Sequence, residues 1–347
     1  MRIALDAMGS DNAPSAELEG VALALDELKD LEVVLVGKPG IVDAATMDGY
    51  SGRLELVPAG EVVGMHESPF EVVKRKRNSS MAVCMELLKQ GKVSGVVSAG
   101  NTGAVMAFAL TILGVVPGVH RPALGALFPT IKGSTLVVDI GANVDTKPLQ
   151  LLQFGIMGTT AASYLFKKAN PSVGLLSIGH EDTKGNELTF SAYQLFKQHD
   201  MNFVGNVEGN AILKGTVDVV VCDGFVGNAL LKYAEGLAEV LSGLLEQYLE
   251  PDSEHRTRRW RRWLSKPVLR EFIERMDYQE HGGALMLGVL GAVVVGHGRS
   301  TPRAIKNALR SAATAAEDNL AEHIRHRFAE TAPEGTVPAR GLSPEPA

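Results

Sequence analysis

Residues 93–109, VSGVVSAGNTGAVMAFA, constrain the fold of this chain more than any other stretch. An apolar run at 93–98 has the length of a buried strand, and the residues after the glycine turn at 99–103 favour a helix. Asn101 or Thr102 can cap that helix, and the free N–H groups of a helix start attract anions. The stretch therefore predicts a strand, a tight turn and a helix whose first turn faces a bound anion. The alternative is an ordinary turn of an α/β protein.

The same pattern of strand, polar glycine-containing turn and helix occurs five times. The apolar runs that lead into such turns lie at 2–5, 93–98, 135–139, 173–178 and 217–222, and a further strand is predicted at 31–36. Strands that alternate with helices predict an α/β fold with a mainly parallel sheet wrapped by helices. Ligands of such sheets bind beyond the carboxyl ends of the strands, so we expect the polar turns to converge there.

The end of the chain adds less regular elements. Residues 282–288 and 293–298 are predicted to form a loop and a strand that enter the site, and one final helix is predicted from Thr301 to about Ala329. We predict one α/β domain over 1–330, which includes the segment 251–276, followed by a proline-containing tail at 331–347 that is disordered.

Composition excludes several classes of function. The net charge of −6 does not indicate a nucleic-acid binder, and two isolated cysteines, Cys84 and Cys222, indicate a cytosolic protein without a disulfide framework. The dinucleotide and P-loop fingerprints, the hydrolase elbow and zinc-ligand spacings are all missing, so we expect neither a metal nor an organic cofactor. The uncharged stretch 93–119 is interrupted by glycines and Pro117, which favours buried structure over a membrane span.

One segment is basic in an otherwise acidic chain. Residues 256–275 hold eight Arg and Lys side chains against two Glu, and both tryptophans of the chain share one helical face there. We predict an amphipathic helical hairpin within 251–276. It fits an anionic membrane surface, or packing against the body or a second subunit. The candidate contact residues are Trp260, Trp263, Arg261 and Arg262.

Nine short motifs carry a further signal. They are DAMGSD (6–11), SSM (79–81), SAGNTGA (98–104), RPAL (121–124), DIGANVD (139–145), QFGIMG (153–158), IGHEDTKG (178–185), CDGFVGN (222–228) and GGALMLG (282–288). Together they resemble the bacterial phosphate acyltransferases of phospholipid synthesis, over about residues 1–325. The resemblance implies a fold similar to the phosphotransacetylases and, more distantly, to isocitrate-type dehydrogenases. The chain departs from that family at Ser10, where Gly is usual, and at His180, where an acidic residue is usual.

The resemblance implies transfer of a long-chain acyl group from acyl-acyl-carrier-protein to inorganic phosphate, which yields acyl phosphate. It also implies a cytoplasmic homodimer that associates peripherally with the inner face of the cell membrane. There a glycerol-3-phosphate acyltransferase uses the product. Two alternatives stay open. One is a phosphotransacetylase that uses acyl-CoA, and the other is a non-catalytic scaffold that brings acidic carrier protein to the membrane through 74–77 and 256–275.

The implied reaction needs no protein nucleophile, because a phosphate oxygen can attack the thioester carbonyl directly. The protein must position phosphate, stabilise the oxyanion and help the thiolate leave. We expect Lys184 to stabilise negative charge and His180 to protonate the thiolate, whereas Asp145 and Asp223 orient neutral donors. The candidate catalytic residues are Lys184, Asn228 and His180, and the candidate substrate-binding residues are Asn101, Thr102, Gly103, Asn143, Asp145 and Asp223.

Overall fold

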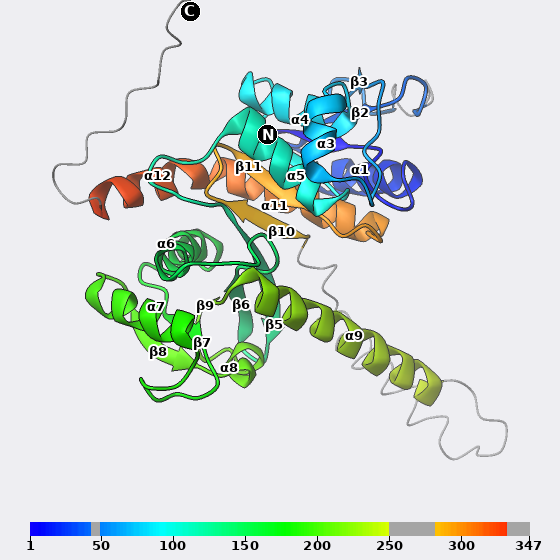
Figure 1. Ribbon diagram of the computed structural model, residues 1–347. Helices are drawn as coiled ribbons and strands as arrows, with labels where there is room; N and C mark the ends of the chain where they lie inside the picture. Colours follow the sequence, from blue (N-terminus) through cyan, green and yellow to red (C-terminus); the bar gives the residue numbers. More distant parts are fainter. Residues whose placement is uncertain (43–48, 250–281, 332–347) are drawn as a thin grey trace, which may run out of the picture.

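The computed structural model describes residues 1–42, 49–249 and 282–331, and the strands of this part form one sheet (Figure 1). The order across the sheet is β3-β2-β1-β4-β11-β10-β5-β6-β9-β7-β8. The strands are β1 Arg2–Asp6, β2 Glu32–Gly37, β3 Leu54–Pro58, β4 Gly95–Ser98, β5 Ala123–Thr130, β6 Gly133–Val138, β7 Val173–Leu176, β8 Phe203–Val207, β9 Val219–Val221, β10 Ala284–Leu287 and β11 Ala292–Val295.

Two parallel groups of strands run in opposite directions within this sheet. The strands β3, β2, β1, β4 and β11 are mutually parallel, and so are β6, β9, β7 and β8. Between the groups, β10 is antiparallel to β11 and β5, and β5 is antiparallel to β6. These three reversals turn the second group around. The mainly parallel sheet is confirmed, but the reversal was not predicted.

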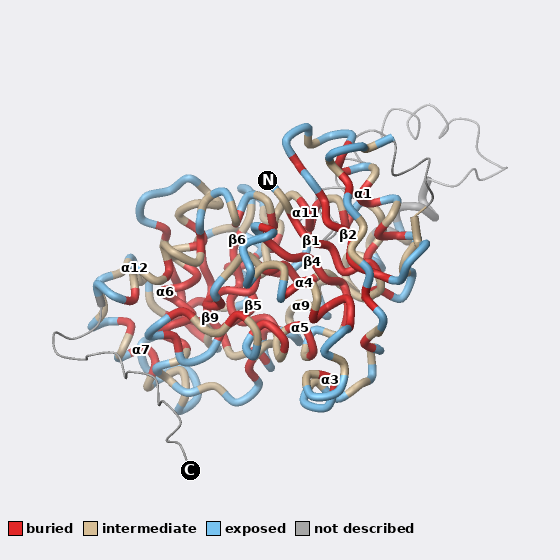
Figure 2. Tube along the Cα trace, turned by 90° about the horizontal axis from the view of Figure 1, so that it is seen from above, coloured by how far each residue is buried: buried red, intermediate tan, exposed pale blue. Residues whose placement is uncertain are grey.

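Helices cover both faces of the sheet (Figures 1 and 2). Because both faces are buried, the strands carry apolar side chains on both sides. Buried side chains of α1, α6, α7, α11 and α12 pack on one face, and those of α3, α4, α5 and α8, with partly buried ones of α9, on the other. The helices are α1 Ser15–Glu27, α3 Pro69–Arg75, α4 Ser80–Lys89, α5 Thr102–Phe108, α6 Pro148–Leu165, α7 Glu187–Gln198, α8 Gly209–Lys214, α9 Gly224–Leu249, α11 Pro302–Glu317 and α12 Leu320–Thr331, and a π-helical turn, Ala109–Leu113, extends α5.

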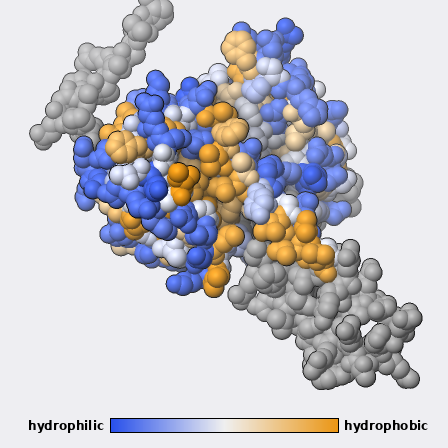
Figure 3. All heavy atoms as spheres, turned by 60° about the horizontal axis from the view of Figure 1, so that its bottom comes forward, coloured by the Kyte–Doolittle hydropathy of each residue, from blue (hydrophilic) through white to orange (hydrophobic). Residues whose placement is uncertain are grey.

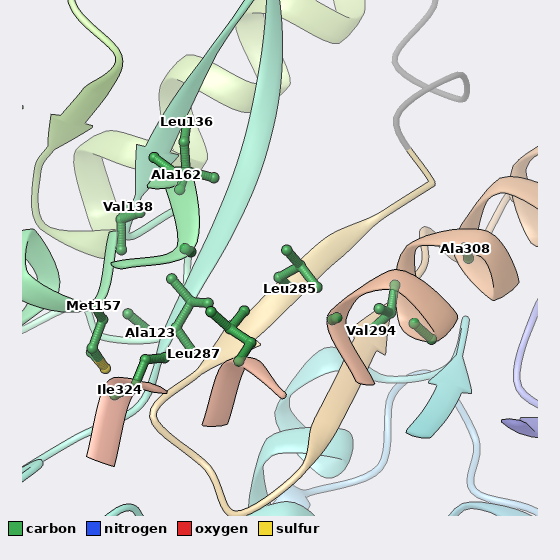
Figure 4. Close-up of a cluster of buried hydrophobic side chains, with 14 of the residues drawn as sticks. Ala123, Leu136, Val138, Met157, Ala162, Leu285, Leu287, Val294, Ala308 and Ile324 are labelled. Atoms are coloured by element: carbon green, nitrogen blue, oxygen red, sulfur yellow. The ribbon is translucent and has the colours of Figure 1, made fainter. Parts of the chain in front are cut away.

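The core continues across the antiparallel strands that join the two groups. Leu285 and Leu287 of β10 lie between Val294 on β11 and Leu136 and Val138 on β6 (Figure 4). All five side chains are buried in the same cluster. Burial of such side chains contributes roughly 1.5–3 kcal/mol each, so this cluster holds the two parallel groups together.

The predicted helix cap at Asn101 is confirmed. The Asn101 side chain accepts a hydrogen bond from the backbone N–H of Ala104 at 3.1 Å, and Ser79 caps α4 in the same way through Ala82 at 3.3 Å. The prediction of a single final helix was wrong. The chain breaks between α11 and α12 at Asn319, whose φ of 50° lies in the left-handed region and ends a helix.

The predicted hairpin at 251–276, with Trp260, Trp263, Arg261 and Arg262, lies outside the described residues, as does most of the predicted tail. Within the ranges that are described, none of the helices combines the length and apolar character needed to cross a bilayer. Helix α9, which precedes the hairpin, extends away from the sheet (Figure 1).

Candidate active site

A cavity of about 490 Å³ lies where turns from both parallel groups meet. The turns after β4 and β11 line it from the first group, and the turn after β6 and the start of α9 line it from the second. Four of the predicted site residues belong to its lining, namely Asn101, Thr102, Gly103 and Asn228. The predicted convergence of polar turns therefore holds for these elements.

The turn after β4 is packed tightly against the turn after β1. A Cβ atom on Gly9 would lie 2.8 Å from the backbone nitrogen of Gly100, so a side chain at Gly9 would push the two turns apart. The Ser98 hydroxyl donates to the Asp6 carboxylate at 2.8 Å. Burial raises the pKa of Asp6, and its hydrogen bonds with Ser80, Ser98 and the Met8 backbone oppose that rise. The first wall of the cavity is thus a rigid pair of turns.

Asn101 is held by three hydrogen bonds within the protein. Its amide nitrogen donates to the carbonyls of Met65 and Glu67, both at 3.0 Å, and its oxygen caps α5. A hydrogen bond from this amide to a substrate would require one of these bonds to break. Gly103 contacts α3, because a Cβ atom there would lie 2.7 Å from Cγ of Pro69. Both residues shape the turn as well as line the cavity.

The turn after β6 is organised by Asp139, which was not among the candidates. Its carboxylate accepts hydrogen bonds from the backbone N–H groups of Leu124, Gly141, Ala142 and Asn143 at 2.7–3.2 Å. Burial raises the pKa of Asp139, and these hydrogen bonds oppose the rise. An aspartate at the end of a predicted strand, two residues before a glycine, was the signal that could have identified it.

Asn143 supports this turn from within. Its side-chain amide donates to Asp139 at 2.9 Å and to the carbonyl of Pro122 at 2.8 Å, and the residue is 3% exposed. Both amide hydrogens are therefore engaged inside the protein, and Asn143 does not line the cavity. Asp145 is exposed and also lies outside the lining.

The start of α9 brings Asn228 to the cavity. The Asp223 carboxylate accepts from the backbone N–H of Val226 at 3.0 Å, as a helix-capping residue does. Gly227 has no room for a side chain because it packs on the backbone carbonyl of Asp139. This close approach places Asn228 beside Gly141, where a Cβ atom on that glycine would be 3.5 Å from Asn228 Cβ.

Lys184 and His180 lie on a different loop, the one that follows β7. The Lys184 side chain is exposed, and its backbone carbonyl accepts from the Ser177 hydroxyl at 3.1 Å. Nδ1 of His180 lies 3.3 Å from the carbonyl of Asn206. Neither residue lines the cavity, and β9 separates β7 from β6 in the sheet. The structure therefore does not bring these two side chains into the lining with Asn101 and Asn228.

Charged residues that sequence analysis missed form a charged wall of the cavity. Nζ of Lys232 on α9 lies 2.9 Å from Nε2 of His297 and 2.8 Å from Oε2 of Glu235. Burial and the charge of Lys232 lower the pKa of His297. The sequence GHGRS at 296–300, which overlaps the end of the predicted strand at 293–298, was a signal for His297. No pattern marks Lys232 within its helix.

These residues offer hydrogen bonds and charge rather than a metal site. Among the residues that the structure describes, His, Cys, Asp and Glu side chains do not gather in groups of three or more that could hold a metal ion. Cys84 and Cys222 are both buried and form no disulfide. Burial raises the pKa of each thiol well above the ordinary value for cysteine. Both thiols therefore stay protonated and unreactive.

Comparison with known sequences gives matches along nearly the whole chain. A family model described as "Fatty acid synthesis protein" matches residues 1–323. A phosphate acyltransferase of Nostoc punctiforme is 45% identical over 332 residues, which cover 94% of this chain and 96% of that protein. Proteins of the same description from Heliobacterium modesticaldum and Desulforamulus reducens are 43% and 46% identical, with 93% and 94% of this chain and 98% and 96% of those proteins covered.

Comparison with solved structures concerns the fold. A phosphotransacetylase from Streptococcus pyogenes aligns with a TM-score of 0.59 at 17% identity, over 92% of this chain and 94% of that chain. A branched-chain phosphotransacylase from Enterococcus faecalis aligns with the same TM-score at 14% identity, over 91% and 99%. The predicted similarity to the phosphotransacetylase fold is confirmed.

Proposed function

The chain belongs to the phosphate acyltransferases, and from this premise we propose that it moves a long-chain acyl group from acyl-acyl-carrier-protein to inorganic phosphate. The observation that carries the proposal is the composition of the cavity. Leu124, Leu127 and Leu231 provide apolar surface, suited to an acyl chain, and the glycine turn with the charged wall provides donors for an oxyanion. One cavity thus accommodates both reacting groups.

In the proposed reaction a phosphate oxygen bonds to the thioester carbonyl carbon, and the carbon–sulfur bond then breaks. The thiolate takes up a proton and leaves as the free carrier thiol. Asn228 donates to the developing oxyanion, Thr102 and Gly103 position phosphate, Lys184 stabilises negative charge and His180 protonates the thiolate. Lys184 and His180 lie on the loop after β7, outside the cavity lining. The sulfur and the oxyanion oxygen are both bonded to the reacting carbon, so these two roles require that loop to move to the cavity when the substrates bind.

A basic surface next to the cavity supports carrier protein as the acyl donor. Helix α3 begins at Pro69, which packs on Gly103 of the cavity. The same helix exposes Phe70 and, at its end, Lys74 and Arg75. An acidic carrier protein that docks here would place its bound acyl group near the glycine turn, because opposite charges steer association.

The test is a turnover assay with the purified protein, long-chain acyl-acyl-carrier-protein and inorganic phosphate, in which hydroxylamine traps acyl phosphate. We expect product that depends on both substrates. Acyl-CoA as the donor provides the decisive comparison. Faster turnover of acyl-CoA would favour a phosphotransacetylase, and no product from either donor would favour the scaffold.

We also propose a cytoplasmic homodimer that associates with the anionic inner face of the cell membrane, where a glycerol-3-phosphate acyltransferase consumes acyl phosphate. The basic composition and two tryptophans of 251–276 support this location. Exposed apolar side chains on α9 support an interaction surface leading to that segment, with Phe225, Val240 and Leu244 at 67%, 59% and 56% exposure. Figure 3 shows apolar side chains gathered on one face of the molecule.

The catalytic domain in this proposal spans 1–330, with 331–347 as its tail.

A further inference from the structure

Asp11 and Arg299 carry opposite charges and line the same cavity, and both residues are exposed. Within the part of the chain that the structure describes, neither the carboxylate of Asp11 nor the guanidinium of Arg299 forms a hydrogen bond or an ion pair. Lys232, which lines the cavity as well, is instead paired with Glu235 at 2.8 Å. The hydrogen-bonding atoms of Asp11 and Arg299 are therefore available to a ligand in the cavity.

The backbone holds these two residues close to each other. The N–H of Asp11 donates to the carbonyl of Gly298, the neighbour of Arg299, at 2.8 Å. Oδ2 of Asp11 lies 3.3 Å from the position that a Cβ atom on Gly298 would take. The same turn is tied to the end of β4, because the N–H of Gly296 donates to the carbonyl of Ser98 at 2.9 Å. The two charges thus lie on turns that are packed together beside the glycine turn after β4.

Both charges also act on one ring of the lining. Burial is the main cause that lowers the pKa of His297. Among the charges around this ring, Arg299 also lowers the pKa, whereas Asp11 raises it. The guanidinium and the carboxylate are therefore both close to His297.

A ligand that contacts both side chains needs oxygens that accept and an O–H group that donates. A guanidinium only donates, in a planar fork that matches two oxygens of a phosphate, and a carboxylate only accepts. At neutral pH inorganic phosphate offers both kinds of group, because it keeps an O–H. We propose that Arg299 binds two oxygens of inorganic phosphate and that Asp11 accepts a hydrogen bond from its O–H group. This inference deepens the proposed function and rests on it.

The carboxylate of Asp11 makes the subsite selective among tetrahedral anions. Sulfate resembles phosphate in shape and charge, but at neutral pH it has no O–H group. Its oxygens would face the Asp11 carboxylate without a hydrogen between them, and the two negative charges would repel each other. Rejection through a repulsive contact is a common source of specificity. On its other side, bound phosphate would face the N–H groups at the start of α5.

The experiment measures the KM for phosphate and the inhibition constant Ki of sulfate, as a competitor of phosphate, in the full-length enzyme. Arg299→Met removes the guanidinium, which binds either anion. We expect the phosphate KM and the sulfate Ki to rise together by about 10- to 100-fold, the effect of a hydrogen bond to a charged group. The KM for acyl-acyl-carrier-protein should stay unchanged.

The role of Asp11 is tested by Asp11→Asn, which keeps the shape of the side chain and removes its charge. An amide can donate to sulfate, so sulfate is no longer repelled. We expect the ratio of the sulfate Ki to the phosphate KM to fall by about 10- to 100-fold. A merely structural role of Asp11 would weaken the binding of both anions alike and leave this ratio unchanged.

Two matched variants control for the loss of a surface charge. Arg325→Met removes an arginine that is 43% exposed and paired with Glu322, outside the cavity lining. Asp30→Asn removes an exposed carboxylate that also lies outside the lining. The phosphate KM and the sulfate Ki of both variants should match those of wild type.

The outcomes separate this inference from the proposed function. A wild-type enzyme that makes acyl phosphate, together with an unchanged phosphate KM in Arg299→Met, overturns the inference alone. An unchanged ratio in Asp11→Asn also overturns it, and so does an equal rise of the acyl-donor KM in Arg299→Met, which would indicate a general distortion. A wild-type protein that makes no acyl phosphate overturns the proposed function and the inference with it.

Discussion

The turns after β4 and β6 and the loop after β7 carry equally distinctive motifs, but they use their polar side chains differently. In the two turns, Asn101 and Asn143 donate both amide hydrogens to other groups of the protein. In the loop after β7, the side chains of His180 and Lys184 are exposed. Buried polar groups must find partners, and in a tight turn the backbone provides them. A polar residue in such a turn can therefore belong to a motif because it holds the turn together, even where it also lines the cavity, as Asn101 does.

The sharpest test of the structural role of the turns is Asp139→Ala. This change leaves four backbone N–H groups around a buried site without their acceptor. We expect the free energy of unfolding to fall by about 4 kcal/mol or more. Urea unfolding followed by circular dichroism measures it. A loss below about 1 kcal/mol would show that the turn does not depend on this carboxylate.

The corresponding test of the loop after β7 is Lys184→Ala. If the loop provides a charge for the reaction, turnover should fall by about 100-fold or more while the unfolding midpoint stays unchanged. Lys168→Ala, another exposed lysine, serves as the control. Wild-type turnover in Lys184→Ala would show that the reaction does not need this exposed side chain of the loop after β7.

Gly103 tests whether a turn can serve packing and binding together. Gly103→Val places a side chain against Pro69, and the crowding should lower the free energy of unfolding by about 1–3 kcal/mol. The phosphate KM should rise as well, because the glycine turn also lines the cavity. Gly209→Val is the matched control, because Gly209 also lies in the first turn of a helix and a Cβ atom there would meet nothing within 4 Å. A destabilised protein with wild-type phosphate KM would assign Gly103 to packing alone.

The smallest expected effect concerns the segment at 251–276 and tests whether this segment contacts the membrane. The double change Trp260→Ala and Trp263→Ala should weaken binding to anionic liposomes by about fivefold, for roughly 1 kcal/mol of lost apolar burial. Turnover of soluble substrate should not change. Co-sedimentation measures liposome binding, and sedimentation velocity measures the dimer. Dissociation of the dimer with unchanged liposome binding would assign the segment to the subunit interface.

Part of the candidate site could be predicted from the sequence because its signals are local. The glycine turn after β4 and its cap at Asn101 follow from a strand, a glycine and a short polar side chain within a few residues. Lys232 and His297 could not be predicted as a pair, because 65 residues separate them and only packing brings their nitrogens to 2.9 Å. Asn143 fits the motif equally well, but its burial became visible only in three dimensions.

The sequence alone determined the alternation of strands and helices, most turns and caps, and membership of the family, since all of these depend on neighbouring residues or on motifs. The tertiary structure decided how the strands pair. β5 contains Pro129 near its end, opposite Ser134 of β6. Because proline is uncommon within strands, this residue makes the segment hard to recognise as a strand from its sequence. Together with β10, β5 reverses the second parallel group. Pairing partners depend on long-range burial of whole faces, which no local pattern specifies, and that burial determines which polar side chains meet in the cavity.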